Sequence, residues 1–396
     1  MRSADWVLLS AAVMVAIPFG VLAVEALASL LPARKGRSGD RPRCAVIVPA
    51  HNEEAGIAAT IQNLRDQLLP GDRLLVVADN CSDGTAIAAR AAGAEVSERT
   101  DLERRGKGYA LDHGISLLIA DPPEVVVIVD ADCVLTAGSL DALVREAAAT
   151  NRPAQGVYLI GTGLEADPRR RLSAFAVLLK NEIRPRGLDR LGMPCLLTGT
   201  GMAFPWLVLR GANLGTGNIV EDMKLGADLA LAGYPPRLCT AARLSGAAAP
   251  DRQAAIKQRT RWEHGHVQTL VTQVPRLIAS GLVRLRPQLI GLGLELLVPP
   301  LSLLVVVWAM LLLVCLMSWQ FFDGNWLPVA VLAGFAVFAI GAIFASWVKF
   351  GRRMLPLSNL LRVPLYIVWK LPIYLKIVGS REKTWVRTER DKSDRM

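Results

Sequence analysis

The sequence of 396 residues contains no CxxC pair and no cluster of cysteine with histidine. Its six cysteines are scattered along the chain, which argues against a disulfide scaffold and against a zinc site. Basic residues are not interleaved with aromatic residues, so the net charge of +10 does not indicate a nucleic-acid-binding protein. No low-complexity arm and no extra soluble domain is evident. A membrane surface and a phosphorylated substrate therefore account best for the positive charge.

What the sequence does contain is long apolar stretches. Hydrophobic residues make up 52% of the chain and the mean hydropathy is +0.34, which is high for a purely soluble protein. The nearly continuous apolar run from Trp6 to Leu31 is long enough to cross a hydrocarbon core of about 30 Å. A cleaved signal peptide is the alternative, but the run is longer than a usual signal-peptide core and lacks a clear cleavage site. We therefore predict a retained transmembrane anchor in residues 1–33.

Two further apolar spans are predicted at Leu289–Met317 and Leu327–Val348. The loop between them has no lysine or arginine, whereas basic residues flank the pair on both sides and also follow the first anchor. By the positive-inside rule, these flanks lie in the cytoplasm. The pattern predicts a multi-pass protein of the bacterial-type inner (plasma) membrane. Two transmembrane helices would lie within residues 288–348, and the large polar region would be cytoplasmic.

Two other segments are predicted to lie along the inner leaflet. Residues 265–287 have apolar side chains at helical spacing; an ordinary amphipathic helix packed on the soluble domain is the alternative. Residues 349–396 combine a basic tail with an apolar stretch, Pro356 to Val378, that charges and prolines interrupt. These interruptions favour an interfacial helix over a further span.

Residues 34–264 are predicted to form an α/β domain. Short apolar runs at Cys44–Val48, Leu74–Ala78 and Val125–Val129 are each followed by a polar turn, which is typical of buried strands. Alternation with helical stretches favours a doubly wound, mostly parallel sheet, in which ligands bind at the carboxyl ends of the strands. Polar motifs stand at all three of these ends.

The third strand leads directly into Asp130-Ala131-Asp132. Residues two apart on an extended segment point the same way, so both carboxylates could face one hard cation that bridges a diphosphate. A pair of exposed turn residues is the alternative. Lys107, between two glycines, could pair with the same diphosphate, although a solvated surface loop has the same composition.

The first two strands are followed by turns that open helices. In the second turn, Asp79 could accept a hydrogen bond from a pyrimidine base or a ribose, and nearby helix N-termini favour phosphate. Asn52 and Asp83 could simply cap helices. Farther along, Asp222 at a helix start is the predicted general base, while Glu221 is expected only to favour the positive helix end.

These motifs occur in the order seen in membrane-bound family 2 glycosyltransferases, the group with cellulose, hyaluronan and poly-N-acetylglucosamine synthases, and the chain resembles that family from about residue 43 to 270. The resemblance implies a GT-A fold with transmembrane and interfacial helices. It also implies an inverting, metal-dependent hexosyltransferase that uses a nucleotide-sugar, with UDP expected as the nucleotide, and Mg²⁺ or Mn²⁺. The implied site residues are Pro49, Glu53, Asp79, Lys107, Asp130, Gln258 and Arg261 at the nucleotide-sugar, Asp132 at the metal, Thr200, Gly201 and Trp262 at the acceptor, and Asp222 as the base.

The sequence also departs from the family. Ala78 stands where the family has the first aspartate of its base-binding pair, and only about three spans are evident. The Gln258-x-x-Arg261-Trp262 pattern favours processive synthesis of an exported polysaccharide. With so few spans, the translocation path would need either a second subunit, which could be another copy or an export subunit, or the interfacial helices. The short membrane part leaves single transfer to a lipid-linked or glycolipid acceptor open. A catalytically silent subunit is disfavoured because Asp132, Asp222 and Trp262 are all present.

Overall fold

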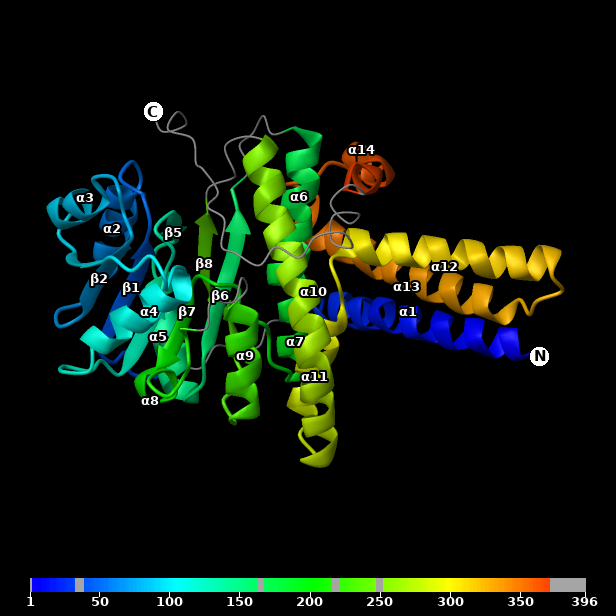
Figure 1. Ribbon diagram of the computed structural model, residues 1–396, viewed down its shortest axis with the longest axis horizontal. Coiled ribbons are helices and arrows are strands. Elements are labelled where there is room, and N and C mark those ends of the chain that lie inside the picture. Colours follow the sequence, from blue (N-terminus) through cyan, green and yellow to red (C-terminus); the bar gives the residue numbers. More distant parts are fainter. Residues whose placement is uncertain (1, 33–38, 162–166, 216–220, 247–251, 371–396) are drawn as a thin grey trace. The chain divides into compact units, whose positions relative to one another are not determined.

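Figure 1 shows the computed structural model of the chain, which describes residues 2–32, 39–161, 167–215, 221–246 and 252–370. The described residues divide into two units. The sheet unit consists of those within 34–161 and 193–265, and the helix unit of those within 1–33, 162–192 and 266–370. One long helix, α10 (Arg252–Val283), contributes residues to both units.

The sheet unit is built on eight strands in the order β3-β2-β1-β4-β7-β6-β8-β5. Their bounds are β1 (Cys44–Ala50), β2 (Arg73–Asp79), β3 (Glu95–Arg99), β4 (Val125–Ile128), β5 (Cys133–Leu135), β6 (Ala154–Ile160), β7 (Met202–Pro205) and β8 (Arg237–Gly246). The pairings β1–β2, β2–β3, β1–β4 and β6–β8 are parallel, and the other three are antiparallel. The predicted mostly parallel α/β sheet is confirmed, and so are the three strands that precede the polar motifs.

Helices cover both faces of this sheet. Their bounds are α2 (Ile57–Arg65), α3 (Thr85–Ala91), α4 (Lys107–Leu117), α5 (Ser139–Thr150), α8 (Trp206–Leu209) and α9 (Glu221–Leu231). Because side chains alternate along a strand, Val46 of β1 packs with the α2 and α5 side chains while its neighbour Ile47 packs with those of α4. Strands buried on both faces explain the continuous apolar runs in the sequence.

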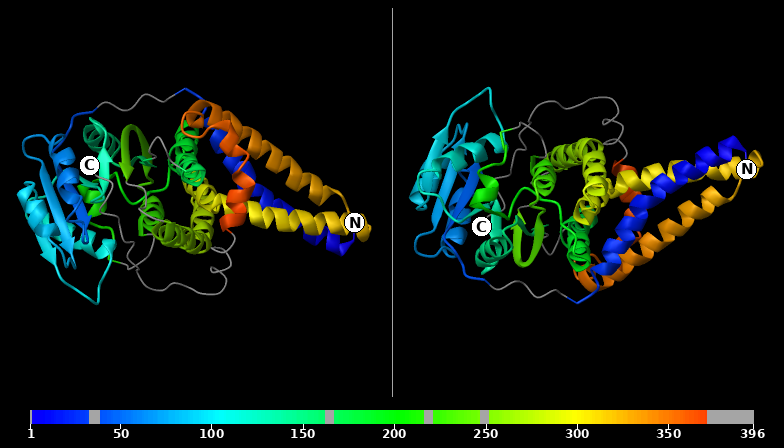
Figure 2. Two further views of the ribbon diagram at one scale, coloured as in Figure 1. Left: turned by 90° about the horizontal axis from the view of Figure 1, so that it is seen from above. Right: turned by 90° about the horizontal axis from the view of Figure 1, so that it is seen from below.

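The helix unit contains three helices that are long and apolar enough to cross a membrane, Ser3–Ala28, Leu301–Phe321 and Leu327–Gly351. They run side by side as α1, α12 and α13 (Figures 1 and 2). The bounds of the unit's elements are α1 (Ser3–Ala28), α6 (Pro168–Leu178), η1 (Leu179–Ile183, a π-helix), α7 (Arg184–Leu191), α11 (Pro287–Leu297), α12 (Leu301–Phe321), α13 (Leu327–Ser346), η2 (Trp347–Gly351, also π) and α14 (Leu357–Leu360).

The predicted single span at Leu289–Met317 is two helices in the structure. α11 ends at Leu297, Val298 is extended with ψ 103°, and α12 starts only after Pro299 and Pro300. A residue before proline avoids the helical conformation, and proline cannot continue a preceding helix, so the apolar run breaks here. The predicted boundary at residue 264 falls inside α10, next to the point between residues 265 and 266 where the two units divide.

Residues 167–192 pack within the helix unit, although the sequence placed them in the soluble domain. The reason is a buried ion pair: Arg184 of α7 donates from Nε to Oε2 of Glu25 on α1 at 2.5 Å, and from Nη2 to the carbonyl of Glu295 on α11 at 2.8 Å. A Cβ on Gly187 would overlap the carbonyl of Glu25, so α7 lies directly on α1. A short helix with charges buried in this way is stable only against those partners.

The segment predicted as an interfacial helix, Pro356–Val378, is described only as far as residue 370. Apolar side chains on it, Leu357, Leu361 and Leu365, are exposed, with Leu361 82% accessible. Residues 371–378 and the basic tail after them lie outside the described residues.

Candidate active site

Two carboxylates follow β4 at the carboxyl end of the parallel strands. Ligand atoms of Asp130, Asp132 and Cys133 all lie within 4.8 Å of one another. The two aspartates are brought together by a turn, closed by a 3.1 Å hydrogen bond from the Cys133 N–H to the Asp130 carbonyl, and not by the extended backbone expected from the sequence. The predicted juxtaposition is therefore present, with a different backbone geometry.

This cluster suits a hard cation. Both carboxylates are partly exposed, whereas the Cys133 thiol is buried. This burial, together with the charges of Asp132 and Asp130, raises the pKa of the thiol well above its usual value. A protonated thiol is a poor ligand, so the donors on offer are carboxylate oxygens. Oxygen donors with open positions are the set that Mg²⁺ and Mn²⁺ prefer. The residues present thus fit the divalent metal that the resemblance implies.

Lys107 connects the acidic cluster to the Thr198–Gly201 turn. It is the first residue of α4, and its Nζ forms an ion pair with Asp130 and donates to the carbonyl of Gly199 at 2.6 Å. Gly106 before it has φ +124°, a conformation that glycine adopts without strain. Lys107 and Asp130 keep 24% and 34% of their side-chain surface accessible, so a ligand can reach both charges.

Asp222 lies close to Lys107 across the same turn. A Cβ on Gly199 would be 3.2 Å from Oδ2 of Asp222 and 3.7 Å from Nζ of Lys107. The other oxygen, Oδ1, accepts the N–H of Met223 at 2.9 Å, which orients the carboxylate at the start of α9. Asp222 therefore presents Oδ2 toward the space beside Lys107, as a base acting near a diphosphate would require. A side chain at position 199 would fill that space.

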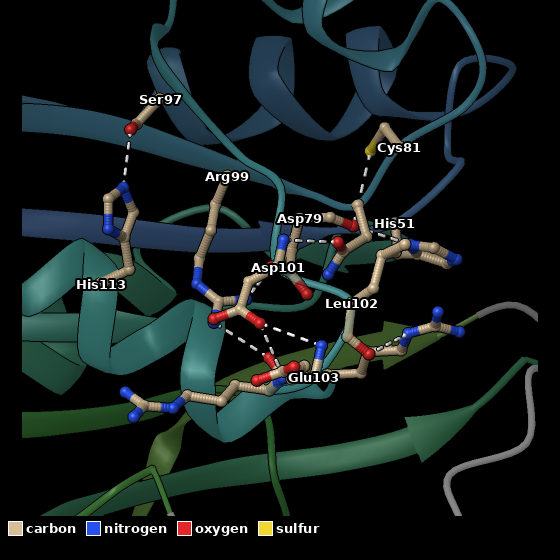
Figure 3. Close-up of polar contacts among 12 residues, drawn as sticks. His51, Asp79, Cys81, Ser97, Arg99, Asp101, Leu102, Glu103 and His113 are labelled. Carbon is tan, nitrogen blue, oxygen red and sulfur yellow. Dashed lines mark hydrogen bonds and ion pairs between the residues drawn. The ribbon is translucent and has the colours of Figure 1, made fainter.

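Asp79, at the end of β2, is 6% exposed and bound on two sides (Figure 3). Arg99 of β3 donates from Nη1 to Oδ1 of Asp79 at 2.6 Å and from Nη2 to Asp101 at 2.9 Å, and His51 Nδ1 lies 2.7 Å from the Asp79 carbonyl oxygen. The Arg99 guanidinium also lies 5.9 Å from the centre of the Tyr109 ring. Arg99, which fixes the predicted site residue Asp79, was not anticipated from the sequence, because the charged edge strand Glu95–Arg99 was not predicted.

The turns after β1 and β2 hold each other. The Asn52 amide and Ser82 exchange hydrogen bonds of 3.1 and 2.7 Å, while Asp83 accepts from the N–H of Thr85 at 3.0 Å and from the N–H of Glu54 at 3.3 Å. Burial raises the pKa of Asp83, but the Thr85 hydroxyl and these backbone donors together leave it lowered. The capping role considered for Asn52 is not seen, because α2 follows Gly56 and the Asn52 side chain binds Ser82 instead. Asp83 accepts the N–H of Thr85, the first residue of α3, which is close to the capping role considered for it.

The remaining predicted residues lie in the same unit. Pro49 pairs with Val77 in the sheet, and Glu53 donates its N–H to the Thr85 hydroxyl at 2.8 Å. The predicted donor and acceptor residues Gln258, Arg261 and Trp262 lie in α10 and are partly buried.

Thr200 and Gly201 form the floor beside Asp130. The Thr200 hydroxyl, in a residue 1% exposed, accepts the N–H of Asp130 at 2.9 Å. Gly201 has φ +63°, and a Cβ there would overlap Leu244. The structure therefore shows Thr200 supporting Asp130; contact of either residue with an acceptor stays a prediction.

The fold and the acidic cluster define a class of nucleotide-sugar-dependent enzymes. Residues 42–265 match the family described as Glycosyltransferase like family 2, which is more than half of the chain, and the protein belongs to this family. The mannosyltransferase PcManGT from Pyrobaculum calidifontis, solved with GDP-Man and Mn²⁺, superposes with a TM-score of 0.57 and 20% identity, covering 95% of this chain and 100% of that one. This likeness shows the GT-A fold.

Curated relatives match over shorter stretches. The probable glycosyltransferase YdaM of Bacillus subtilis is 32% identical over 114 residues, which is 26% of this chain and 26% of the relative. The uncharacterized protein MJ1222 of Methanocaldococcus jannaschii is 36% identical over 88 residues, 22% of this chain and 34% of the relative. The chain thus covers about a quarter to a third of these relatives.

Proposed function

We propose that the protein is an inverting hexosyltransferase that transfers a sugar from a nucleotide-sugar to an acceptor hydroxyl. The observation that carries this proposal is the arrangement around Gly199, where a lysine, two aspartates that fit a divalent metal and a third, separately oriented aspartate converge. Membership of the glycosyltransferase family supports the same reaction.

Asp222 is the proposed base. It removes the acceptor hydroxyl proton as the acceptor oxygen bonds to the anomeric carbon, and the bond from that carbon to the diphosphate breaks on the opposite face. A single displacement with one base inverts the anomeric centre. The nucleoside diphosphate leaves with the bonding electron pair, and Lys107 offsets the charge that grows on it.

Asp130 and Asp132 would hold Mg²⁺ or Mn²⁺, which supplies positive charge to the diphosphate. The solved neighbour with Mn²⁺ supports a divalent cation. UDP is the nucleotide expected from the resemblance, whereas that same neighbour carries GDP-Man, so both nucleotides belong in the test. Asp79, fixed by Arg99, is the proposed contact for the base or ribose, with Pro49, Glu53, Gln258 and Arg261 completing the donor site.

The acceptor is proposed to be a growing cell-surface or exported polysaccharide, with Thr200, Gly201 and Trp262 at the acceptor site. The three apolar helices support a membrane-bound enzyme, and the lysine and arginine flanks support a cytoplasmic sheet unit in a bacterial-type inner membrane. The exposed leucines of 357–365 favour an interfacial position for that segment. Transfer of one sugar to a lipid-linked acceptor is the second candidate, because only three such helices are found among the described residues.

The test is incorporation by membranes that contain the protein. These membranes are incubated with radiolabelled UDP- and GDP-sugars and Mn²⁺ or Mg²⁺, and the products are sized by gel filtration, with membranes of the Asp222→Asn variant as the blank. Material of high mass from one donor supports the polymerase. A single-sugar increment in the lipid extract supports the second candidate, and no incorporation above the blank from any donor contradicts both.

A further inference from the structure

Gln155 is a buried amide that the reaction outlined above does not use. It lies in β6 and is 2% exposed. Its Oε1 accepts the N–H of Thr198 at 2.9 Å, and its Nε2 donates to the carbonyls of Thr200 at 2.9 Å and of Gly156 at 2.8 Å. A longer bond of 3.5 Å reaches the Gly201 carbonyl. Both polar atoms of the amide are therefore bound to backbone, and three of the four bonds go to the Thr198–Gly201 turn.

The turn that Gln155 holds has an unusual backbone. Gly199 has φ +88° and Gly201 has φ +63°, and residues 198–200 belong to no strand or helix. Backbone groups of such a segment cannot be satisfied by a regular ladder, so a side chain must supply the partners. Gln155 does this from the sheet, with an acceptor for one end of the turn and a donor for the other.

The other side of the turn faces the charged cluster. The Gly199 carbonyl accepts from Lys107 at 2.6 Å, and the Thr200 hydroxyl accepts the N–H of Asp130 at 2.9 Å. Gly199, which lies between the Gln155-bound residues Thr198 and Thr200, is thus the residue that binds Lys107. A shift of the turn would move the lysine and the first aspartate together.

We propose that Gln155 is a positioning residue for transfer, because its amide fixes the Thr198–Gly201 turn that holds Lys107 and Asp130 at the donor diphosphate. The proposal rests on the proposed function for what Lys107 and Asp130 bind. Glutamine suits the position because its amide has an acceptor and a donor at one end of a flexible chain. An apolar side chain of the same length would leave the Thr198 N–H and the Thr200 carbonyl without their partner.

The first test compares Gln155→Met with Val144→Ala. Methionine keeps the length and removes both hydrogen-bonding ends, while Val144, 0% exposed in α5, reports the effect of an ordinary core loss. We expect kcat/KM for the donor to fall about 10- to 100-fold in Gln155→Met, the usual cost of removing a residue that orients active-site groups. Val144→Ala keeps kcat. Equal kinetics for both variants would overturn the proposal.

Gln155→Glu distinguishes the acceptor role of the amide oxygen from the donor role of the amide nitrogen. A carboxylate keeps the acceptor for the Thr198 N–H but turns lone pairs toward the Thr200 and Gly156 carbonyls. A buried carboxylate facing carbonyls takes up a proton readily, and the protonated form can donate again. We expect the rate of Gln155→Glu relative to wild type to rise at least about threefold from pH 8 to pH 6. A flat ratio across this range would contradict the donor role of the amide.

Hydrogen exchange tests the turn without any turnover. We expect the Thr198 amide, followed in peptides covering residues 195–203 of the full-length protein, to exchange at least about tenfold faster in Gln155→Met than in wild type or Val144→Ala. Faster exchange in a protein that transfers no sugar would sink the proposed function and leave the role of Gln155 in the turn intact. Unchanged exchange would overturn the role of Gln155 whatever the activity.

Discussion

The two units each contain a lysine or arginine paired with a carboxylate, and the two pairs differ in exposure. In the sheet unit, Lys107 and Asp130 keep 24% and 34% of their side-chain surface. In the helix unit, Arg184 and Glu25 keep 5% and 3%. The open pair can exchange partners with a metal or a diphosphate from solvent, whereas the closed pair can bind only what the fold provides. We therefore expect the Lys107–Asp130 pair to take part in ligand binding and catalysis, and the Arg184–Glu25 pair to stabilise the fold.

The energetics of the two pairs differ for the same reason. Partly exposed charges keep much of their hydration, so rearranging them around a ligand costs little. Removing one member of a buried pair leaves an uncompensated charge, which costs several kcal/mol. We call Lys107, Asp130, Asp132 and Asp222 the open cluster. Substitutions in it should therefore alter turnover with little change in stability. Substitutions at the closed pair, Arg184 and Glu25, should lower stability with little change in turnover.

The largest effect is expected at Asp222. We expect Asp222→Asn to lower kcat about 10²- to 10⁴-fold because the acceptor proton has no base, while nucleotide binding and unfolding temperature are retained. The matched control is Asp228→Asn on the same helix, where the carboxylate pairs with Lys224 at 2.6 Å. The measurement is the initial rate with whichever nucleotide-sugar supports incorporation in the membrane assay. Full turnover in Asp222→Asn would refute its assignment as the base.

Arg184→Met should act on stability alone. Because Glu25 would be left buried and unpaired, we expect a loss of about 3–5 kcal/mol in the free energy of unfolding, measured by denaturation of the purified protein in detergent. The surface control Arg90→Met, which breaks the exposed pair with Glu98, should cost about 1 kcal/mol or less. The double variant Glu25→Leu with Arg184→Met should recover most of the loss. A double variant as unstable as the single one would refute the charge explanation.

A smaller effect is expected from His266, which is 4% exposed in the helix unit. Burial first, then the charge of Lys180, lowers its pKa to about 3, with the Leu296 carbonyl opposing the shift. The folded histidine is then neutral while the unfolded one takes up a proton below about pH 6.5, so stability falls as pH drops from 6.5 toward 3.

At pH 5 this protonation should cost about 2 kcal/mol relative to pH 7, and His266→Gln should remove that part of the pH dependence. The control is His113→Gln, whose partly exposed ring lies 2.9 Å from the Ser97 hydroxyl. The measurement is unfolding temperature at the two pH values. An unchanged pH dependence in His266→Gln would show that other groups are responsible.

The smallest effect concerns a pair of intermediate exposure, Arg99 and Asp79, at 13% and 9%. We expect Arg99→Met to raise the donor KM about fivefold, roughly the worth of one hydrogen bond, because Asp79 loses its orientation. The control is Arg73→Met, which breaks an outer pair with Glu95. A loss of stability without a change in KM would show that Arg99 stabilises the fold, as Arg184 does, and has no role in donor binding.

The sequence was sufficient to predict the features that a local pattern of residues determines, namely the buried strands and the polar residues at their carboxyl ends. Val125–Val129 is apolar because β4 is buried on both faces, and Asp130 follows because the carboxyl end of such a strand opens to ligands. Arg99 was missed because β3 is a charged edge strand without an apolar signature. The contacts of Gln155 with a turn more than forty residues away, and of Arg184 with Glu25 across 159 residues, have no local signal at all.

The most direct test of the open cluster as the donor site is titration calorimetry of UDP and GDP with the purified protein, with Mn²⁺ present and with the metal removed. The account predicts that one nucleotide binds in the presence of metal, and that binding weakens at least about tenfold without it and in Asp132→Asn. Lys224→Met, outside the cluster, should bind as wild type does. Equal affinity in wild type and Asp132→Asn, with and without metal, would contradict the account.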